Sequence, residues 1–325
     1  MIISKTGIQH KITPARIGRA LWSLVRGVII IGICFTILQP LFVKLSVSFM
    51  SEQDLLDSAV KYIPKHFTLG NYKLALKGMD YWNSLSRTFL LSAGVALLQL
   101  CSCMLTAYGF ARFRFPFKKL LFGCVILMLI VPPQIIMLPL YMHFRFFDVF
   151  GLIKAFNHGN PISLLKTYWP FVIQAATCTG FKNGLFIYML RQFFKGMPRE
   201  LEEAAFMDGC NKFRTFIRII LPSSVPMMVT IFLFGFVWQW LDSFYTSMYL
   251  AQMQSKVIPV ALDSLAASVY KEYNNFGGSM NFVSPGFVSM MNNTGTILAI
   301  VPLIILYIIC QRYFVEGIER SGIVG

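Results

Sequence analysis

Residues 200–222 read ELEEAAFMDGCNKFRTFIRIILP, a charged stretch that separates two long apolar blocks of the chain. Pro198, just before it, suits the first turn of a helix. Glu200, Glu202 and Glu203 lie near the start of that helix, where carboxylates favour the positive end of the helix dipole. A small apolar face follows at helical spacing, formed by Leu201, Ala204 and Ala205. The first part of the stretch therefore predicts a short helix with an acidic start.

The pair Asp208-Gly209 ends this helix, because glycine adopts left-handed geometry without a steric penalty. Apolar residues then recur at helical spacing, with cations at the other positions, until Pro222 interrupts the pattern. The apolar set is Phe213, Phe216, Ile217 and Ile220, and the cations are Lys212, Arg214 and Arg218. We therefore expect a hairpin of two short helices that projects from the membrane.

A short helix that presents alanines lets another protein approach closely, so we expect the first helix to dock in a groove on a cytoplasmic partner. The alternative is an amphipathic helix that lies on the membrane surface, although such helices are usually basic on their polar face. The acidic start of the helix disfavours an anionic membrane surface.

The composition places the whole chain in a bilayer. Its 325 residues are 56% hydrophobic and only 13% charged, and the mean hydropathy is +0.63. Six apolar blocks are long enough to cross a hydrocarbon layer roughly 30 Å thick as helices. They run approximately from Arg26 to Phe49, Asn83 to Phe110, Lys119 to Met142, Tyr168 to Leu190, Ser223 to Tyr245 and Thr294 to Gln311. The predicted fold class is an all-α membrane protein with six transmembrane helices.

Lysine and arginine are concentrated in alternate connections, which places both termini in the cytoplasm. The predicted organisation is a cytoplasmic segment 1–25, a transmembrane domain 26–312 and a cytoplasmic tail 313–325. Outer loops are expected at 50–82, 143–167 and 246–293, and the cytoplasmic loop at 191–222. The net charge of +15 comes from cations that flank membrane segments, so we expect no nucleic-acid partner. The seven cysteines lack the paired spacing of a metal site, and we expect none.

The stretch ELEEAAFMDGCNKFRTFIRIILP resembles the EAA loop of ABC importer permeases, the motif that couples membrane helices to ATPase subunits. The recurring residues of that motif match Glu203, Ala204, Ala205, Asp208, Gly209, Leu221 and Pro222. With the apolar residues around them, the predicted ATPase-coupling set is Glu200, Leu201, Glu203, Ala204, Ala205, Asp208, Gly209, Phe213, Phe216, Leu221 and Pro222.

Other segments resemble the carbohydrate-uptake, maltose-type branch of these permeases: IPKHFTLGNY, AYGFARFRFPFKK, VPPQIIMLPLY and QRYFVEGIERSGIVG. The resemblance implies the type I importer permease fold in a bacterial-type inner membrane. It departs at Lys154 to Lys166, which looks like an insertion, and at the longer outer loop around Tyr270 to Asn292.

The chain has no GxxxxGK[ST] loop, so we expect no enzymatic activity and no cofactor in it. The resemblance implies that ATP and Mg are bound by two partner ATPase subunits. It further implies a second permease in a hetero-dimer, a solute-binding protein outside the membrane, and a carbohydrate as substrate. We expect an oligosaccharide, with an acidic one left open.

Polar residues within spanning segments are costly and are candidates for a solute path. They are Gln99, Gln134, Gln174, Lys182, Asn183, Trp238, Gln239 and Asp242. Amides and indole rings suit sugar hydroxyls and ring faces, although amides also serve as hydrogen bonds between membrane helices. Lys182 lies between two glycines in GFKNG, where it either meets an anionic substrate, pairs with a carboxylate such as Asp242, or faces the inner cavity.

Two other function classes remain open from the residues alone. An ion-coupled secondary carrier needs intramembrane ionisable residues and repeat symmetry, and the sequence shows no internal repeat. A non-transporting membrane scaffold would bind a cytoplasmic partner through the same loop without moving a solute.

Overall fold

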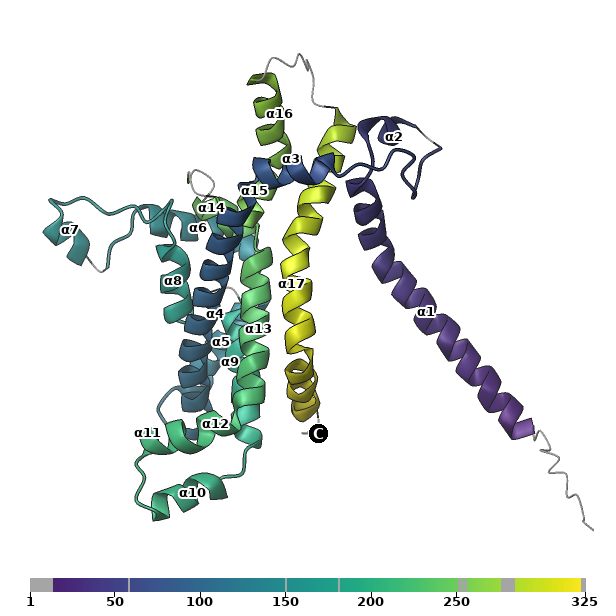
Figure 1. Cartoon of the computed structure of the whole chain (residues 1–325). Coiled ribbons are helices and arrows are strands. Elements are labelled where there is room, and N and C mark those ends of the chain that lie inside the picture. The colour runs from purple at the N-terminus through teal and green to yellow at the C-terminus, as the bar shows by residue number, and fades with distance from the viewer. Residues whose placement is uncertain are drawn as a thin grey trace, which may run out of the picture.

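The computed structural model describes residues 14–57, 59–149, 151–180, 182–250, 253, 256–275 and 284–322. Over these residues the chain is helical, and its one β feature is an isolated antiparallel bridge between Phe147 and Ile162. The longest helices set the long dimension of the molecule (Figure 1): α1 (Pro14–Ser48), α4 (Tyr81–Arg112), α13 (Val225–Leu241) and α17 (Pro285–Gly322). The predicted all-α class is confirmed.

Helix α4 is the centre of the main bundle. It lies against α13, α8 (Trp169–Ala176) and α9 (Asn183–Gly196), and α9 lies in turn against α5 (Lys118–Ile130). Small side chains on α4, namely Ala96, Cys103 and Ala107, are buried in these contacts. Small residues let neighbouring membrane helices approach closely, which explains how α4 contacts three helices at once.

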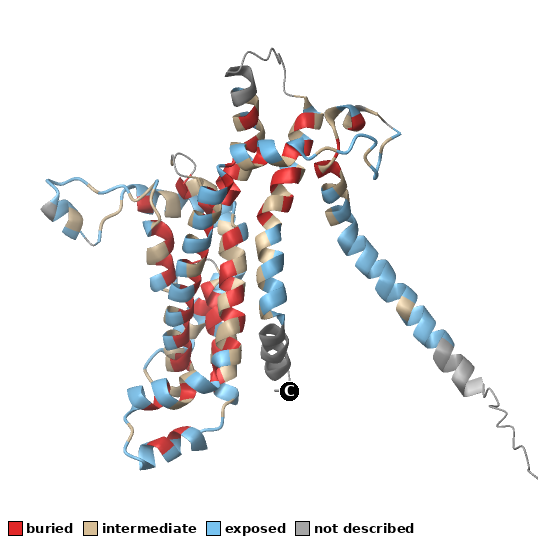
Figure 2. Ribbon diagram, in the orientation of Figure 1, coloured by how far each residue is buried: buried red, intermediate tan, exposed pale blue. Residues whose placement is uncertain are grey.

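Helix α1 leaves the bundle and contacts α17. Its apolar side chains, such as Leu21, Ile31 and Phe42, are exposed along most of its length (Figure 2). Such a helix is stable only where lipid or another apolar surface surrounds it, as expected for a membrane segment.

Three described helices are long and apolar enough to span a membrane: Leu21–Ser48, Tyr81–Arg112 and Pro285–Gln311. The count rises to five if each of two bent pairs is taken as one span, namely Lys118–Ile130 with Pro133–Arg145 and Lys212–Ser223 with Val225–Leu241. The remaining predicted span, the fourth block from Tyr168 to Leu190, is divided into α8, which ends at Ala176, and α9, which begins at Asn183. Hydropathy located the apolar blocks but did not predict their breaks.

The break in the third block has a clear chemical cause. Helix α5 ends at Ile130, and α6 (Pro133–Arg145) leaves at an angle of 104°. Pro132 and Pro133 have no backbone N–H, and a proline also keeps the preceding residue out of the helical region. Val131 accordingly adopts an extended conformation. The expectation of one uninterrupted helix from Lys119 to Met142 is wrong.

Short helices occupy both ends of the bundle (Figure 1). At one end lie α2 (Glu52–Leu56), α3 (Gly70–Gly78), α15 (Ile258–Asp263) and α16 (Leu265–Asn275). At the opposite end lie α10 (Glu200–Met207), α11 (Lys212–Thr215), the π-turn η1 (Phe216–Ile220) and α12 (Leu221–Ser223). The connecting segments add α7 (Leu152–Phe156) and α14 (Phe244–Leu250). Part of the outer loop around Tyr270 to Asn292 lies outside the described residues.

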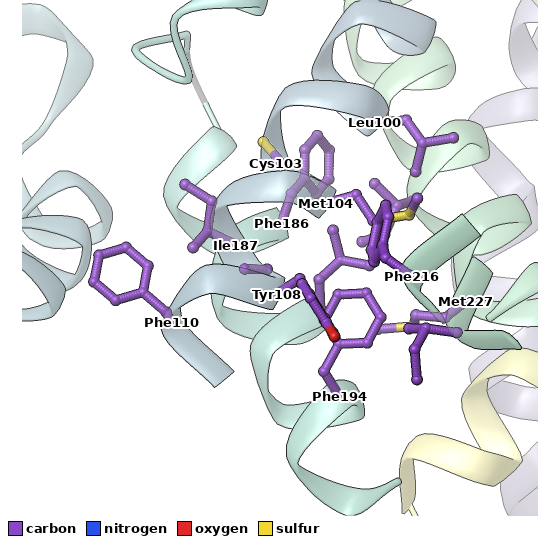
Figure 3. Packing of buried hydrophobic residues seen from close by; sticks show 14 of the residues in the cluster. Leu100, Cys103, Met104, Tyr108, Phe110, Phe186, Ile187, Phe194, Phe216 and Met227 are labelled. Atoms are coloured by element: carbon purple, nitrogen blue, oxygen red, sulfur yellow. The ribbon is translucent and has the colours of Figure 1, made fainter. Parts of the chain in front are cut away.

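The largest apolar cluster joins α4, α9 and the segment of residues 200–222, here called the hairpin. Figure 3 shows Tyr108, Phe194 and Phe216 side by side in this cluster. The Tyr108 ring lies 4.7 Å from Phe216 and 5.7 Å from Phe194, measured between ring centroids. The hairpin is therefore anchored to the end of α4 and is not a free loop.

Candidate functional site

A small cavity of about 50 Å³ lies between α4, α8, α9 and α13. Six of the predicted solute-path residues line it: Gln99, Gln174, Lys182, Trp238, Gln239 and Asp242. Asn183 is buried beside it and donates a hydrogen bond of 3.3 Å from its amide to the Gln174 carbonyl oxygen. Gln134 is exposed on α6 and is not among the lining residues. Polar residues that are distant in sequence thus converge on one hollow.

The break between α8 and α9 places Lys182 at the cavity. Lys182 has a φ of +74°, a left-handed conformation that costs an L-residue energy. It caps the start of α9, and its ammonium nitrogen lies 5.0 Å from the centroid of the Trp238 ring. Trp238 is itself stacked between Phe186 and Phe234, with centroid distances of 5.6 and 5.4 Å. The result is a cation on an aromatic face at the edge of the cavity.

Asp242 is fixed at the junction between α13 and α14. Its carboxylate accepts hydrogen bonds from the Tyr245 N–H at 3.2 Å and from the Thr246 N–H and hydroxyl, both at 3.0 Å. This is the geometry of a helix N-cap, which explains why a carboxylate is tolerated here. Asp242 therefore has a structural role in addition to its place in the cavity wall.

The amides divide into two kinds. The Gln174 side chain donates to the Pro170 carbonyl oxygen and to the Tyr249 hydroxyl, both at 3.1 Å, so it joins α8 to α14. This is the interhelical role that was the alternative to solute contact. Gln99 faces Gly235 so closely that a Cβ added there would lie 3.1 Å from its Oε1 atom. Gly235 therefore makes the room that Gln99 occupies in the cavity wall.

The hairpin has the two-helix form predicted from its sequence. Helix α10 ends at Met207, and Gly209 follows with a φ of +79°. The Asn211 side chain then caps the next helix by accepting a 2.8 Å hydrogen bond from the Arg214 N–H. The second helix is not regular: the Leu221 N–H donates to the Phe216 carbonyl oxygen five residues earlier. This π-turn precedes Pro222, which has no N–H to continue the normal ladder.

An ion pair that the sequence did not predict holds the hairpin to α4. The Arg112 Nε atom lies 2.8 Å from the Glu202 Oε1 atom, in a geometry that suits an ion pair but not a hydrogen bond. Both side chains are almost fully enclosed, with 7% and 11% of their surfaces exposed. Arg112 also donates a 2.8 Å hydrogen bond to the carbonyl oxygen of Met197, just before α10. Arg112 therefore binds both the segment just before the hairpin and the first helix of the hairpin.

The predicted coupling residues separate into an exposed and a buried group. The exposed ones are Glu200, Leu201, Glu203, Ala204, Asp208, Gly209, Phe213 and Pro222. Leu221 is partly buried, while Ala205 and Phe216 are buried. The predicted apolar face of Leu201, Ala204 and Ala205 is thus divided, because Glu202 and Ala205 point inward together at i, i+3 spacing. The Glu202 carboxylate can be buried because it forms an ion pair with Arg112.

Comparisons with known proteins identify the family of the chain. Residues 103–320 match the family described as "Binding-protein-dependent transport system inner membrane component". The alpha-glucoside transport system permease protein AglG of Rhizobium meliloti is 27% identical over 81% of this chain and 62% of its own length. The probable starch degradation products transport system permease protein AmyC of Thermoanaerobacterium thermosulfurigenes is 24% identical over 90% of this chain and 94% of its own length.

The fold has a counterpart among solved structures. A chain in the crystal structure of a bacterial ABC transporter involved in the import of the acidic polysaccharide alginate superposes with a TM-score of 0.70. The match covers 91% of this chain and 98% of that one at 19% identity, so it shows a shared fold. The family model covers about two thirds of the chain, and the chain therefore belongs to the inner-membrane permease components of binding-protein-dependent ABC transport systems.

Proposed function

We propose that this chain is one of two permease subunits that together form the membrane path for an oligosaccharide, driven by separate ATP-binding subunits. The observation that carries the proposal is the path of α4. This helix lines the cavity with Gln99 and holds the hairpin with Arg112. The two residues lie roughly 20 Å apart along one continuous helix, at about 1.5 Å per residue.

A continuous helix transmits displacement from one end to the other as a rigid element. ATP-driven closure of the motor subunits would move the exposed face of the hairpin, and the enclosed pair of Arg112 and Glu202 would carry that movement into α4. Gln99 and the facing Gly235 would then shift relative to each other. Packed interfaces with two stable arrangements can convert a small movement at one site into a change of access at another.

The size of the cavity supports a second permease. Binding sites for small molecules usually occupy roughly 300–1,000 Å³, whereas this cavity holds about 50 Å³. A sugar therefore does not fit within this cavity alone, and a facing subunit would supply the rest of the path. The relatives that are named as permeases for alpha-glucosides and starch degradation products favour a carbohydrate as the solute.

The polar lining supports the same class of solute. Gln99 and Gln239 offer amide donors and acceptors to sugar hydroxyls. Lys182, at the edge of the cavity, favours a sugar that carries a carboxylate. The alginate transporter that shares this fold is described as handling an acidic polysaccharide.

The topology follows from the same proposal. Counting α8 with α9 as a broken sixth span gives six crossings. The start of α1 and the far end of α17 lie toward the same end of the molecule as the hairpin (Figure 1), which favours both termini on the cytoplasmic side. The opposite end, with α2, α3, α15 and α16, then faces the solute-binding protein.

Uptake by the complete complex in proteoliposomes tests this function. The complex would be reconstituted with its solute-binding protein outside and ATP inside, and offered a labelled neutral maltooligosaccharide or a labelled oligouronate. We expect uptake of one of them to require ATP and to persist when a protonophore removes the proton gradient. Uptake that continues without ATP but stops with the protonophore would identify an ion-coupled carrier instead. Intact assembly without any uptake would favour the scaffold.

A further inference from the structure

Five cations gather at the hairpin end of α5 and α9. They are Arg114, Lys118, Arg191, Lys195 and Arg199, and we call them the cation platform. Arg114 comes from the turn between α4 and α5, and Lys118 is the first residue of α5. The other three come from α9 and the segment that leads into α10. Arg191 and Lys195 lie four residues apart, so they share one face of α9. The fold thus brings together charges from separate parts of the chain.

Cations surround Lys118 within the described residues, whereas the nearby carboxylates Glu200 and Glu203 lie exposed on α10. The charged side chains that act on Lys118 there are Arg191, Lys195, Arg114 and Arg199, all of the same sign. Glu202, the buried carboxylate of the hairpin, is already held by Arg112. Like charges at this density repel one another and attract an anion from outside the chain.

Aromatic rings lie beside two of these cations, namely Phe122 beside Arg191 and Phe115 beside Lys118, whose ammonium nitrogen is 5.9 Å from the centroid of that ring. The Arg191 guanidinium lies 3.8 Å from the centroid of the Phe122 ring on α5, and its Nε–H is buried without a hydrogen-bond acceptor among the described residues. The Lys118 ammonium donates a 2.7 Å hydrogen bond to the Phe113 carbonyl oxygen. The general excess of cations on the inner side explains their sign. It does not explain a buried, unpaired guanidinium donor.

An apolar surface borders the cation platform. Phe117, Leu120 and Leu121, at the start of α5, expose large parts of their side chains. Cations at a helix end beside exposed apolar side chains match the two halves of a phospholipid, a phosphate and its acyl chains. A soluble protein partner would match the charges but not the apolar surface along a membrane helix.

We propose that the cation platform binds the phosphate of an anionic phospholipid, whose acyl chains lie along α5. The ligand approaches from the membrane side, since Arg191 lies against Phe122 of α5 while the cavity lies between α4, α8, α9 and α13. Arg199 immediately precedes α10, so a lipid bound here would also fix the start of the hairpin. The proposal is independent of which solute the permease carries.

Lipid binding to the purified complex tests the inference. Native mass spectrometry would measure retention of phosphatidylglycerol and of phosphatidylcholine with the same acyl chains, for the wild type and for the double variant Lys118→Gln/Arg191→Gln. Each cation near a membrane surface contributes a factor of roughly five, so the double variant should lose roughly 30-fold in phosphatidylglycerol affinity. The control, Lys61→Gln/Lys73→Gln, removes two exposed lysines at the opposite end and should bind as the wild type does.

A charge-keeping variant and a competition experiment test whether the charges bind a phospholipid. The variant Lys118→Arg/Arg191→Lys changes the same two positions but keeps both charges, and it should retain at least a third of the wild-type affinity. A loss of affinity in the glutamine variant alone would then be due to the missing charges and not to disturbed folding. Equal retention of the two lipids by the wild type would overturn the proposal. So would displacement of phosphatidylglycerol by millimolar inorganic phosphate, since that would indicate a free-anion site, or unchanged binding by the glutamine variant, since a subunit contact would then cover the platform.

Discussion

Single residues at the cavity and in the hairpin offer direct tests of the proposed function. Lys182 occupies a left-handed position at the cavity, with its ammonium nitrogen over the Trp238 ring. A strained residue beside a cavity is a common mark of function, because the surrounding structure must stabilise its unfavourable conformation. Because of this left-handed conformation, only some substitutions remove the charge of Lys182 without also destabilising the backbone.

Replacement of Lys182 by asparagine removes the charge with little backbone cost, since asparagine tolerates left-handed geometry better than most residues. We expect Lys182→Asn to lower uptake of an acidic oligosaccharide by about tenfold, which corresponds to about 1.4 kcal/mol of lost attraction. Uptake of a neutral oligosaccharide should stay within about twofold, and Lys182→Arg should keep the acidic solute. A loss that is equal for both sugars would remove Lys182 from the solute contacts.

Gly209 offers a second test at this scale. A Cβ there would meet no atom within 4 Å, but the φ of +79° disfavours any L-residue by about 1–2 kcal/mol, most of all a β-branched one. We expect Gly209→Val to leave the protein in the membrane and to raise the number of ATP molecules hydrolysed per sugar imported at least tenfold.

The matched control for Gly209 is Gly209→Asn, which should change that ratio by less than about twofold. The two variants differ in backbone preference while both add a side chain to open space. Unchanged uptake by the valine variant would show that the turn does not need a left-handed residue for coupling.

At the scale of elements, the hairpin has one face for the bundle and another for a partner. Its buried face carries Glu202, Ala205 and Phe216, and its exposed face carries acidic and apolar residues that include Glu203 and Phe213. Exposed apolar side chains on a cytoplasmic element mark an interaction surface. The two faces therefore separate anchoring from docking within one short element.

Charge reversal on the exposed face should weaken assembly with the ATP-binding subunits. We expect Glu203→Lys to reduce their co-purification with the permease at least fivefold, because a carboxylate that faces the docking groove would be replaced by a cation. Asp263→Lys makes the same charge change at the opposite end of the molecule and should leave the complex intact. Full recovery of the complex with Glu203→Lys would exclude this face from docking.

The sequence predicted these elements unevenly. Long apolar runs and the glycine between two short helices are local signals, and they predicted the bundle helices and the hairpin. Hydropathy averages over a window and ignores direction, so it did not predict the 104° turn after Ile130 or the break at residues 177–182. The two prolines at 132 and 133 were the available signal for the first of these.

The pair of Arg112 and Glu202 was beyond sequence reasoning for a different reason. Its members lie on separate elements, and only the packing of Tyr108 against Phe194 and Phe216 brings those elements together. The sequence predicted polar residues of a solute path, but it did not predict the position or size of the cavity that six of them line. Gln134 does not line this cavity, because its helix turns away after Pro132, and its place in a solute path stays a prediction.

On the scale of the whole molecule, the structure links a cavity, a continuous helix and an anchored hairpin. We propose that movement of the hairpin reaches the cavity through α4, whose buried small residues lie in close contact with neighbouring helices. The enclosed ion pair is the connection on which this account depends. Breaking such a pair costs about 3–5 kcal/mol because it leaves one charge buried without a partner.

The most direct test is therefore a charge-exchange cycle at this pair. Arg112→Glu, Glu202→Arg and the double variant would be compared in the reconstituted complex by the ratio of sugar imported to ATP hydrolysed, after each complex is shown to assemble. We expect each single variant to lower this ratio at least tenfold and the double variant to recover at least half of the wild-type value. Single variants that import as much sugar per ATP as the wild type would contradict coupling through Arg112 and Glu202.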